Sequence, residues 1–327
     1  MPGSIEIPKD ENPCYFLGAE KDSKKGASGR GEKMIIYCID ISGSMDTDFK
    51  GKTRLEAVKE AIRDEIKRMK FQGENAKVAV ITFGSEVNVM MQPKNAQIPP
   101  GDYYDFDKIA ASASKIKEFA LPVQTHHKHF EKLVGDITTY GCTALGPALV
   151  TAIELAGRAR GSKVVLCTDG MANQGIMGPE FYTRAANFAK KKGVMVSILS
   201  IKGDPCNLKE LGKLSLTSGG SVLKIDPDLF GSEFNKISKE NVFGTDTNMR
   251  IVVNHFFEIE SESPEEVSRD KTILTQDFGN FTAETELTFN FRMLSRDEAA
   301  IKGVNMEIMK QKRLPMQVQL TYLNPDG

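Results

Sequence analysis

The stretch that decides the fold is residues 34–69, MIIYCIDISGSMDTDFKGKTRLEAVKEAIRDEIKRM. It begins with the apolar run MIIYCI, and such continuous hydrophobicity is typical of a strand buried on both faces of a parallel sheet. Five apolar residues then recur at steps of three and four: Leu55, Val58, Ile62, Ile66 and Met69. This period predicts the buried face of a helix, and Thr53 with Glu56 forms a capping-box pattern at its start. The stretch therefore predicts a buried strand, a turn and an amphipathic helix.

The same alternation of strand and helix patterns continues to residue 240. Three further apolar runs are typical of buried strands, at residues 78–83, 164–167 and 194–201. Helical patterns occupy 145–156 and 179–192, and we also expect helices at 105–119 and 227–240. Strands that alternate with helices indicate the α/β class with a doubly wound, mostly parallel sheet. We therefore assign residues 34–240 to one such domain.

The pattern changes after residue 240. Apolar and polar residues alternate at 286–293 and 316–322, which predicts antiparallel strands with one solvated face, and 250–259 and 271–275 are their expected partners. We expect a smaller, sandwich-like β-rich domain at 241–327 and interpret the acidic stretch 258–270 as a solvated loop. Residues 1–33 are interpreted as an N-terminal segment and linker. Their apolar residues are candidates for strands that complete the β-rich domain: Ile5, Ile7, Tyr15 and Phe16.

Composition narrows the class of protein. The 327 residues are 40% hydrophobic and 27% charged, with 43 basic and 44 acidic residues and a net charge of −1, which argues against a nucleic-acid-binding protein. No apolar run approaches the roughly 18 residues of a membrane span, and the first residues lack the basic and apolar regions of a secretory signal. The five cysteines are scattered, without a C-x-x-C pair. We therefore expect a cytoplasmic protein without a disulfide framework.

Oxygen-bearing side chains follow two of the predicted strands. Asp40, Ser42 and Ser44 come directly after the first buried run, and Gly43 between them is expected to allow tight curvature. Asp169 follows the run at 164–167 and would reach the same edge of the sheet, where ligands of open α/β sheets bind. Thr143, just before a predicted helix, supplies a third hydroxyl. Such hard oxygen donors favour Mg²⁺ over Zn²⁺.

With these residues in place, the chain resembles the von Willebrand factor type A domains, over residues 34–240. The resemblance implies an intracellular member with an intact metal-ion-dependent adhesion site formed by Asp40, Ser42, Ser44, Thr143 and Asp169. It implies a divalent cation, Mg²⁺ with Mn²⁺ or Ca²⁺ as alternatives, held by both serines and by Thr143 or Asp169 directly. Asp40 would act directly or through water. One coordination position would remain for a Glu or Asp of a partner protein, and the chain would be a subunit of a larger assembly.

Several alternatives compete with this reading. A Mg²⁺-dependent hydrolase would need a general base. Near the serines the sequence offers Asp46 and Asp48, and neither has a defined role. A structural scaffold domain with a vestigial metal site is the second alternative. We expect a binding module that is not an enzyme. The insertion at 92–142 is interpreted as a helical elaboration of the sheet edge, although it leads into the Thr143 loop and is a candidate recognition surface.

Two further groups of residues invite a chemical reading. His126, His127 and His129 lack the remaining ligands of a transition-metal site, which favours a solvated helix start. Cys142 lacks the histidine and asparagine that a cysteine nucleophile requires, although it stands where the type A family usually has glycine.

Overall fold

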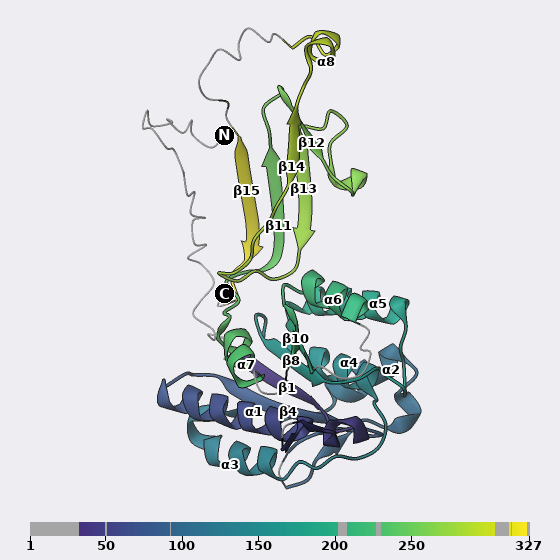
Figure 1. The fold of residues 1–327 in the computed structure, drawn as a ribbon, viewed down its shortest axis with the longest axis vertical. Coiled ribbons are helices and arrows are strands. Elements are labelled where there is room, and N and C mark those ends of the chain that lie inside the picture. The colour runs from purple at the N-terminus through teal and green to yellow at the C-terminus, as the bar shows by residue number, and fades with distance from the viewer. Residues whose placement is uncertain are drawn as a thin grey trace. The chain divides into compact units, whose positions relative to one another are not determined.

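The fold is taken from a computed structural model that describes residues 33–49, 51–91, 93–201, 208–226, 230–304, 314 and 316–325. Figure 1 shows the described elements, which comprise an α/β region and a set of smaller antiparallel sheets. The predicted N-terminal strand residues Ile5, Ile7, Tyr15 and Phe16 lie outside the described residues.

The α/β region is built on an eight-stranded sheet with the order β10-β9-β8-β1-β4-β5-β6, and β7 pairs with β4 outside this path. Its strands are β1 (Met34–Asp40), β4 (Lys77–Phe83), β5 (Val87–Val89), β6 (Ala96–Gln97), β7 (Leu121–Pro122), β8 (Lys163–Thr168), β9 (Met195–Ile201) and β10 (Val222–Ile225). The strands β10, β9, β8, β1 and β4 are mutually parallel, whereas β5, β6 and β7 pair antiparallel. The predicted doubly wound, mostly parallel sheet is therefore confirmed.

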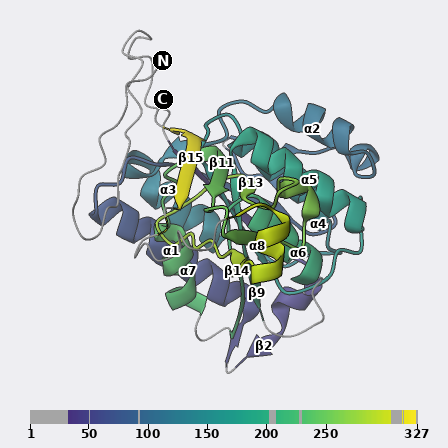
Figure 2. The same cartoon turned by 90° about the horizontal axis from the view of Figure 1, so that it is seen from above.

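Helices cover both faces of this sheet. They are α1 (Arg54–Phe71), α2 (Phe106–Ser114), α3 (Val123–Gly135), α4 (Leu145–Ala156), α5 (Pro179–Lys192), α6 (Leu208–Thr217) and α7 (Phe230–Lys239). Apolar residues of α1, α3 and α7 share one buried cluster, and those of α2, α4, α5 and α6 share another on the opposite face. Figure 2 shows α1, α3 and α7 on one side of the α/β region and α2, α4, α5 and α6 on the other. The central strands β1, β4, β8 and β9 are almost entirely buried between these two layers, which explains why they are continuous apolar runs.

The start of α1 follows from local chemistry. The Thr53 side chain accepts a hydrogen bond from the backbone N–H of Glu56, and the Glu56 carboxylate accepts one from Thr53 N. This capping box satisfies two backbone donors that the first turn of a helix leaves unpaired. The predicted helix at 105–119 is shorter in the structure, because α2 ends at Ser114.

The antiparallel region comprises the three-stranded sheet β13-β11-β15 and the pair β12-β14. These strands are β11 (Thr245–Val252), β12 (Phe257–Glu260), β13 (Ile273–Phe278), β14 (Asn290–Met293) and β15 (Gln317–Leu323), and α8 (Arg296–Ile301) follows β14. Residues 250–259 were predicted as one strand, and this was wrong. Asn254 makes a turn there: its side chain accepts from Phe256 N, and its carbonyl accepts from Phe257 N. Asparagine favours such turns, so the segment is divided between two sheets.

The acidic stretch 258–270 differs from its prediction as a solvated loop at its start, whereas residues 260–270 are exposed or half-buried. Glu258 lies in β12 and is only 6% exposed. Its carboxylate accepts from Arg292 at 2.6 Å and from Lys302 at 2.6 Å, and these charges lower the pKa of Glu258. The basic partners lie 34 and 44 residues away in sequence, which is why the acidic run alone was misleading.

Among the described residues, no helix is long and apolar enough to cross a bilayer.

Candidate functional site

The candidate site lies at the carboxyl ends of two neighbouring strands. Asp40 is the last residue of β1, and Asp169 follows Thr168, the last residue of β8. β1 and β8 are adjacent and parallel, so both carboxylates reach the same edge of the sheet. After Asp40 the chain turns through a short 3-10 helix, Gly43–Asp46. Gly43 does not have positive φ, so the turn does not depend on the conformational freedom of glycine.

A chain of hydrogen bonds links four of the five predicted site residues. One carboxylate oxygen of Asp40 accepts from Ser42 N at 2.9 Å. The hydroxyl oxygens of Ser42 and Ser44 are 3.1 Å apart, and Ser44 Oγ donates to Asp169 Oδ1 at 2.8 Å. Asp40 and Asp169 are fully buried and Ser42 is nearly so. The structure thus places two hydroxyls between two buried carboxylates.

The fifth predicted residue, Thr143, reaches this edge on a separate loop. Tyr140 N donates to Ile41 O at 2.6 Å, and Gly43 N donates to Gly141 O at 3.2 Å, so the loop is attached to the Asp40–Ser44 turn. Thr143 itself is 4% exposed, and its N–H donates to the Asn173 side chain at 2.7 Å. The loop and the serine turn therefore form one edge of the molecule.

The buried carboxylate of Asp40 is costly to ionise, and a bound cation would lower that cost. Its carboxylate accepts hydrogen bonds from Ser42 N and from the Thr168 hydroxyl at 2.6 Å, and both donors are neutral. Burial raises the pKa of Asp40 to about 6, although these hydrogen bonds lower it. A buried carboxylate with neutral partners is costly to ionise. Together with the adjacent hydroxyl oxygens, it fits the donor set of a hard divalent cation.

The structure also brings Arg54 to the site, which sequence reasoning missed. Arg54 is the first residue of α1, and its Nη1 atom lies 2.5 Å from Asp169 Oδ2 and 3.4 Å from Ser44 O. A cation at the start of a helix opposes the helix dipole. A basic residue at the first position of a predicted helix was therefore the signal in the sequence that Arg54 needs an acidic partner. The sequence does not reveal which acidic residue is that partner.

The three histidines and the cysteine that the sequence also offered as candidates take no part in the hydrogen bonds described above. Among the residues that the structure describes, no three His, Cys, Asp or Glu side chains are grouped as a metal site. The candidate site has only two carboxylates, and its other oxygen donors are hydroxyls. His126, His127 and His129 lie in the first two turns of α3. Cys142 is an exposed free thiol whose N–H donates to Ser85 Oγ at 2.9 Å.

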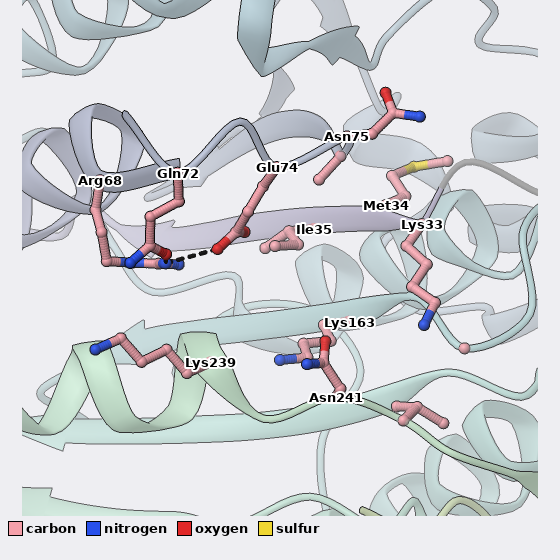
Figure 3. Close-up of a pocket in the computed structure, with 13 residues that line it drawn as sticks. Lys33, Met34, Ile35, Arg68, Gln72, Glu74, Asn75, Lys163, Lys239 and Asn241 are labelled. Carbon is pink, nitrogen blue, oxygen red and sulfur yellow. Dashed lines mark hydrogen bonds and ion pairs between the residues drawn. The ribbon is translucent and has the colours of Figure 1, made fainter. Parts of the chain in front are cut away.

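A cavity of about 560 Å³ lies at the opposite ends of β1 and β8 (Figure 3). It is lined at one side by Met34, the first residue of β1, so the length of the strand separates it from Asp40. Arg68 and Glu74 form an ion pair of 2.6 Å in its wall. Lys163, which is 6% exposed, donates from Nζ to Ile237 O at 3.2 Å near the end of α7. This cavity is therefore no part of the candidate site.

The buried Lys163 is expected to give the protein a pH dependence of stability that is separate from the candidate site. Burial lowers its pKa from 10.5 to about 8, although Glu240 and other acidic groups oppose this. Between these two values the unfolded chain retains a proton that the folded protein has released, so folding becomes more favourable as pH rises. We expect Lys163→Met to remove up to about 3 kcal/mol of this increase, as measured by urea unfolding across that range. Parallel pH profiles for the variant and the wild type would contradict the prediction.

Comparisons with known proteins agree with this fold. Residues 35–172 match the family model of the von Willebrand factor type A domain. Circularly permutated Ras protein 1 of Dictyostelium discoideum is 28% identical over 361 aligned residues, which cover 98% of this chain and 41% of that protein. The chain thus spans about two fifths of the length of this relative.

Two solved structures extend the likeness over most of the chain. A von Willebrand factor type A protein from Catenulispora acidiphila has a TM-score of 0.59 at 19% identity, over 90% of this chain and 63% of that one. The human COPII-coat protein Sec24c has a TM-score of 0.58 at 13% identity, over 90% of this chain and 42% of that one. At such identities the likeness concerns the fold. Residues 35–172 are therefore similar in sequence to the von Willebrand factor type A domain, and the chain shares the fold of these two structures.

Proposed function

We propose that this chain recognises partner proteins through a divalent cation at the carboxyl ends of β1 and β8. The observation that carries the proposal is the hydrogen-bonded series Asp40–Ser42–Ser44–Asp169, with the Thr143 loop attached beside it. Type A domains are typically protein-interaction modules, which supports binding rather than catalysis. The favoured cation is Mg²⁺, because carboxylate and hydroxyl oxygens are its preferred class of ligand.

The residues of this chain have separate tasks in such a site. Ser42, Ser44 and Thr143 would supply neutral oxygens, and Asp40 would supply negative charge from within the protein. A bound divalent cation would supply an open coordination position for a Glu or Asp side chain of the partner. Because the protein's own donors are mostly neutral hydroxyls, the cation's charge is only partly offset, and an incoming carboxylate is attracted.

A hydrolase is the weaker alternative. The two acidic residues near the serine turn, Asp46 and Asp48, are exposed, whereas a general base must be held within hydrogen-bond reach of an activated water. We further propose a cytoplasmic location and a role as a subunit of a larger assembly. The described cysteines Cys38, Cys142 and Cys167 are free thiols, which supports a reducing compartment.

The proposal predicts cation-dependent capture of carboxylates. A library of short immobilised peptides with a fixed central Glu should retain the protein in MgCl2 and release it in EDTA. The same library with Gln at that position should retain about tenfold less or none, because the neutral amide cannot replace an anionic ligand. Binding is measured as protein retained per bead at equal concentration.

Ser44→Ala removes a hydroxyl at the site, and the matched control is Ser261→Ala, which removes the hydroxyl of an exposed residue after β12, outside the α/β region. Only Ser44→Ala should reduce capture. Equal retention by the Glu and Gln libraries, or retention unaffected by EDTA, would contradict the proposed function. Turnover of a phosphate ester that Ser44→Ala abolishes would favour the hydrolase instead.

A further inference from the structure

The ion pair between Arg54 and Asp169 places a permanent positive charge inside the candidate site. The two side chains are 9% and 0% exposed, and their closest atoms are 2.5 Å apart. We propose that Arg54 sets the charge of this site: it offsets Asp169, weakens the cation's binding and strengthens binding of the partner's carboxylate. This inference rests on the proposed function and deepens it, because it names the residue that balances the two affinities.

The placement of Arg54 is unfavourable without its acidic partner. It is the first residue of α1, where the N–H groups of the first turn already present positive charge. Its guanidinium is nearly buried. A buried charge of this kind needs a hydrogen-bonded counter-charge, and Asp169 Oδ2 supplies it. The ion pair is therefore a buried part of the candidate site and not a surface ion pair.

The two carboxylates of the site are consequently not equivalent. Asp169 accepts from Ser44 on one oxygen and from Arg54 on the other, so a cationic partner inside the protein compensates it. Asp40 accepts only from neutral groups in the hydrogen bonds that the structure shows. The negative charge available to a bound cation therefore comes mainly from Asp40.

Charge counting then gives the consequence for recognition. Two carboxylates and one guanidinium leave the site with a net charge of minus one. With a divalent cation the site carries plus one, which a single carboxylate of a partner neutralises. Without Arg54 the loaded site is already neutral, and an incoming carboxylate gains less. The same loss removes a positive charge that repels the cation, so the two affinities should change in opposite directions.

Arg54→Gln tests this directly. We expect its Mg²⁺ dissociation constant, measured by calorimetry with the metal alone, to fall about tenfold. We also expect its retention on the Glu-centred peptide library, at saturating MgCl2, to fall about tenfold. Each factor corresponds to ~1.4 kcal/mol of electrostatic free energy. A merely structural role for Arg54 would weaken both kinds of binding together.

A matched control lies on the same helix. Arg68 forms a comparable ion pair with the fully buried Glu65, at 2.5 Å, near the other end of α1. Arg68→Gln should destabilise the fold. It should leave Mg²⁺ affinity and peptide retention within about twofold of wild type, because it changes no charge at the candidate site. Arg54→Lys, which keeps the charge, should keep peptide retention within about threefold of wild type.

Arg54→Met guards against a Gln variant that fails to fold, because it also removes the positive charge and leaves every predicted cation ligand in place. We expect the same opposite changes in it, with about tenfold tighter Mg²⁺ binding and about tenfold lower peptide retention. Unchanged or weaker Mg²⁺ binding in folded Arg54→Gln or Arg54→Met would overturn the inference, as would unchanged peptide retention. Wild-type protein that binds neither Mg²⁺ nor the Glu library would instead refute the proposed function.

Discussion

Asp40→Asn is expected to make the metal-free protein more stable and to abolish its stabilisation by Mg²⁺. Ionised Asp40 is buried among neutral donors, and burial raises its pKa from 3.8 to about 6. The asparagine amide can accept from Ser42 N and donate to Thr168 Oγ1 without carrying charge. At about pH 7.5 we expect the metal-free free energy of unfolding to rise by about 1–3 kcal/mol, as measured by urea titration in EDTA.

The pH dependence gives this prediction a second readout. Because the folded pKa of Asp40 is raised, its contribution to metal-free stability is present below about pH 4 and is lost as pH rises through about 6. The variant should lack this decline. Saturating MgCl2 should stabilise the wild type by ~2.7 kcal/mol at one hundred times the dissociation constant, and the variant hardly at all.

Asp46→Asn provides the control for Asp40→Asn, because it neutralises an exposed carboxylate on the same turn. This control should retain both the pH dependence and the Mg²⁺ effect. If Asp40→Asn kept the full stabilisation by Mg²⁺, the assignment of Asp40 to the cation site would be wrong.

Gly84→Ala is expected to damage the candidate site without removing any of its side chains. Gly84 follows β4, and a Cβ atom at this position would lie 2.1 Å from the backbone carbonyl oxygen of Tyr140. The loop that carries Thr143 must therefore move, and its hydrogen bonds from Tyr140 N to Ile41 O and from Ala144 N to Gly84 O are disturbed. We expect a loss of about 2–4 kcal/mol in the free energy of unfolding.

The displaced loop should also weaken Mg²⁺ binding by about tenfold or more, because coordination tolerates little misplacement of a ligand. Calorimetric titration with MgCl2 measures this, and urea unfolding measures the stability. Gly101→Ala is the control, since a Cβ there meets no atom within 4 Å. A Gly84→Ala protein with wild-type Mg²⁺ affinity would show that the Thr143 loop does not contribute to the cation site.

Much of the α/β region was predictable because its signals are local. The apolar run at 34–39 and the spacing from Leu55 to Met69 indicate a strand and a helix, and the structure shows β1 and α1 there. The antiparallel region was less predictable. Its strands are short and its turn at Asn254 carries only one asparagine, so periodicity alone joined two strands that belong to different sheets.

The candidate site divides in the same way. Asp40, Ser42 and Ser44 are close in sequence and directly follow a strand, so their residue types and spacing suffice to place them at one edge. Asp169 was expected at that edge because parallel strands end together. The contribution of Arg54 was not predictable, because its partner lies 115 residues away in the chain.

The sequence by itself determined the main alternation of strands and helices in the α/β region and the identity of the oxygen donors, since both depend on residue type and short spacings. Only the tertiary structure decided the charge and the rigidity of the site. It pairs Arg54 with Asp169, leaves Asp40 among neutral donors, and fits the Thr143 loop against Gly84. These are contacts between distant segments, and their energies depend on burial and distance, which no local pattern encodes.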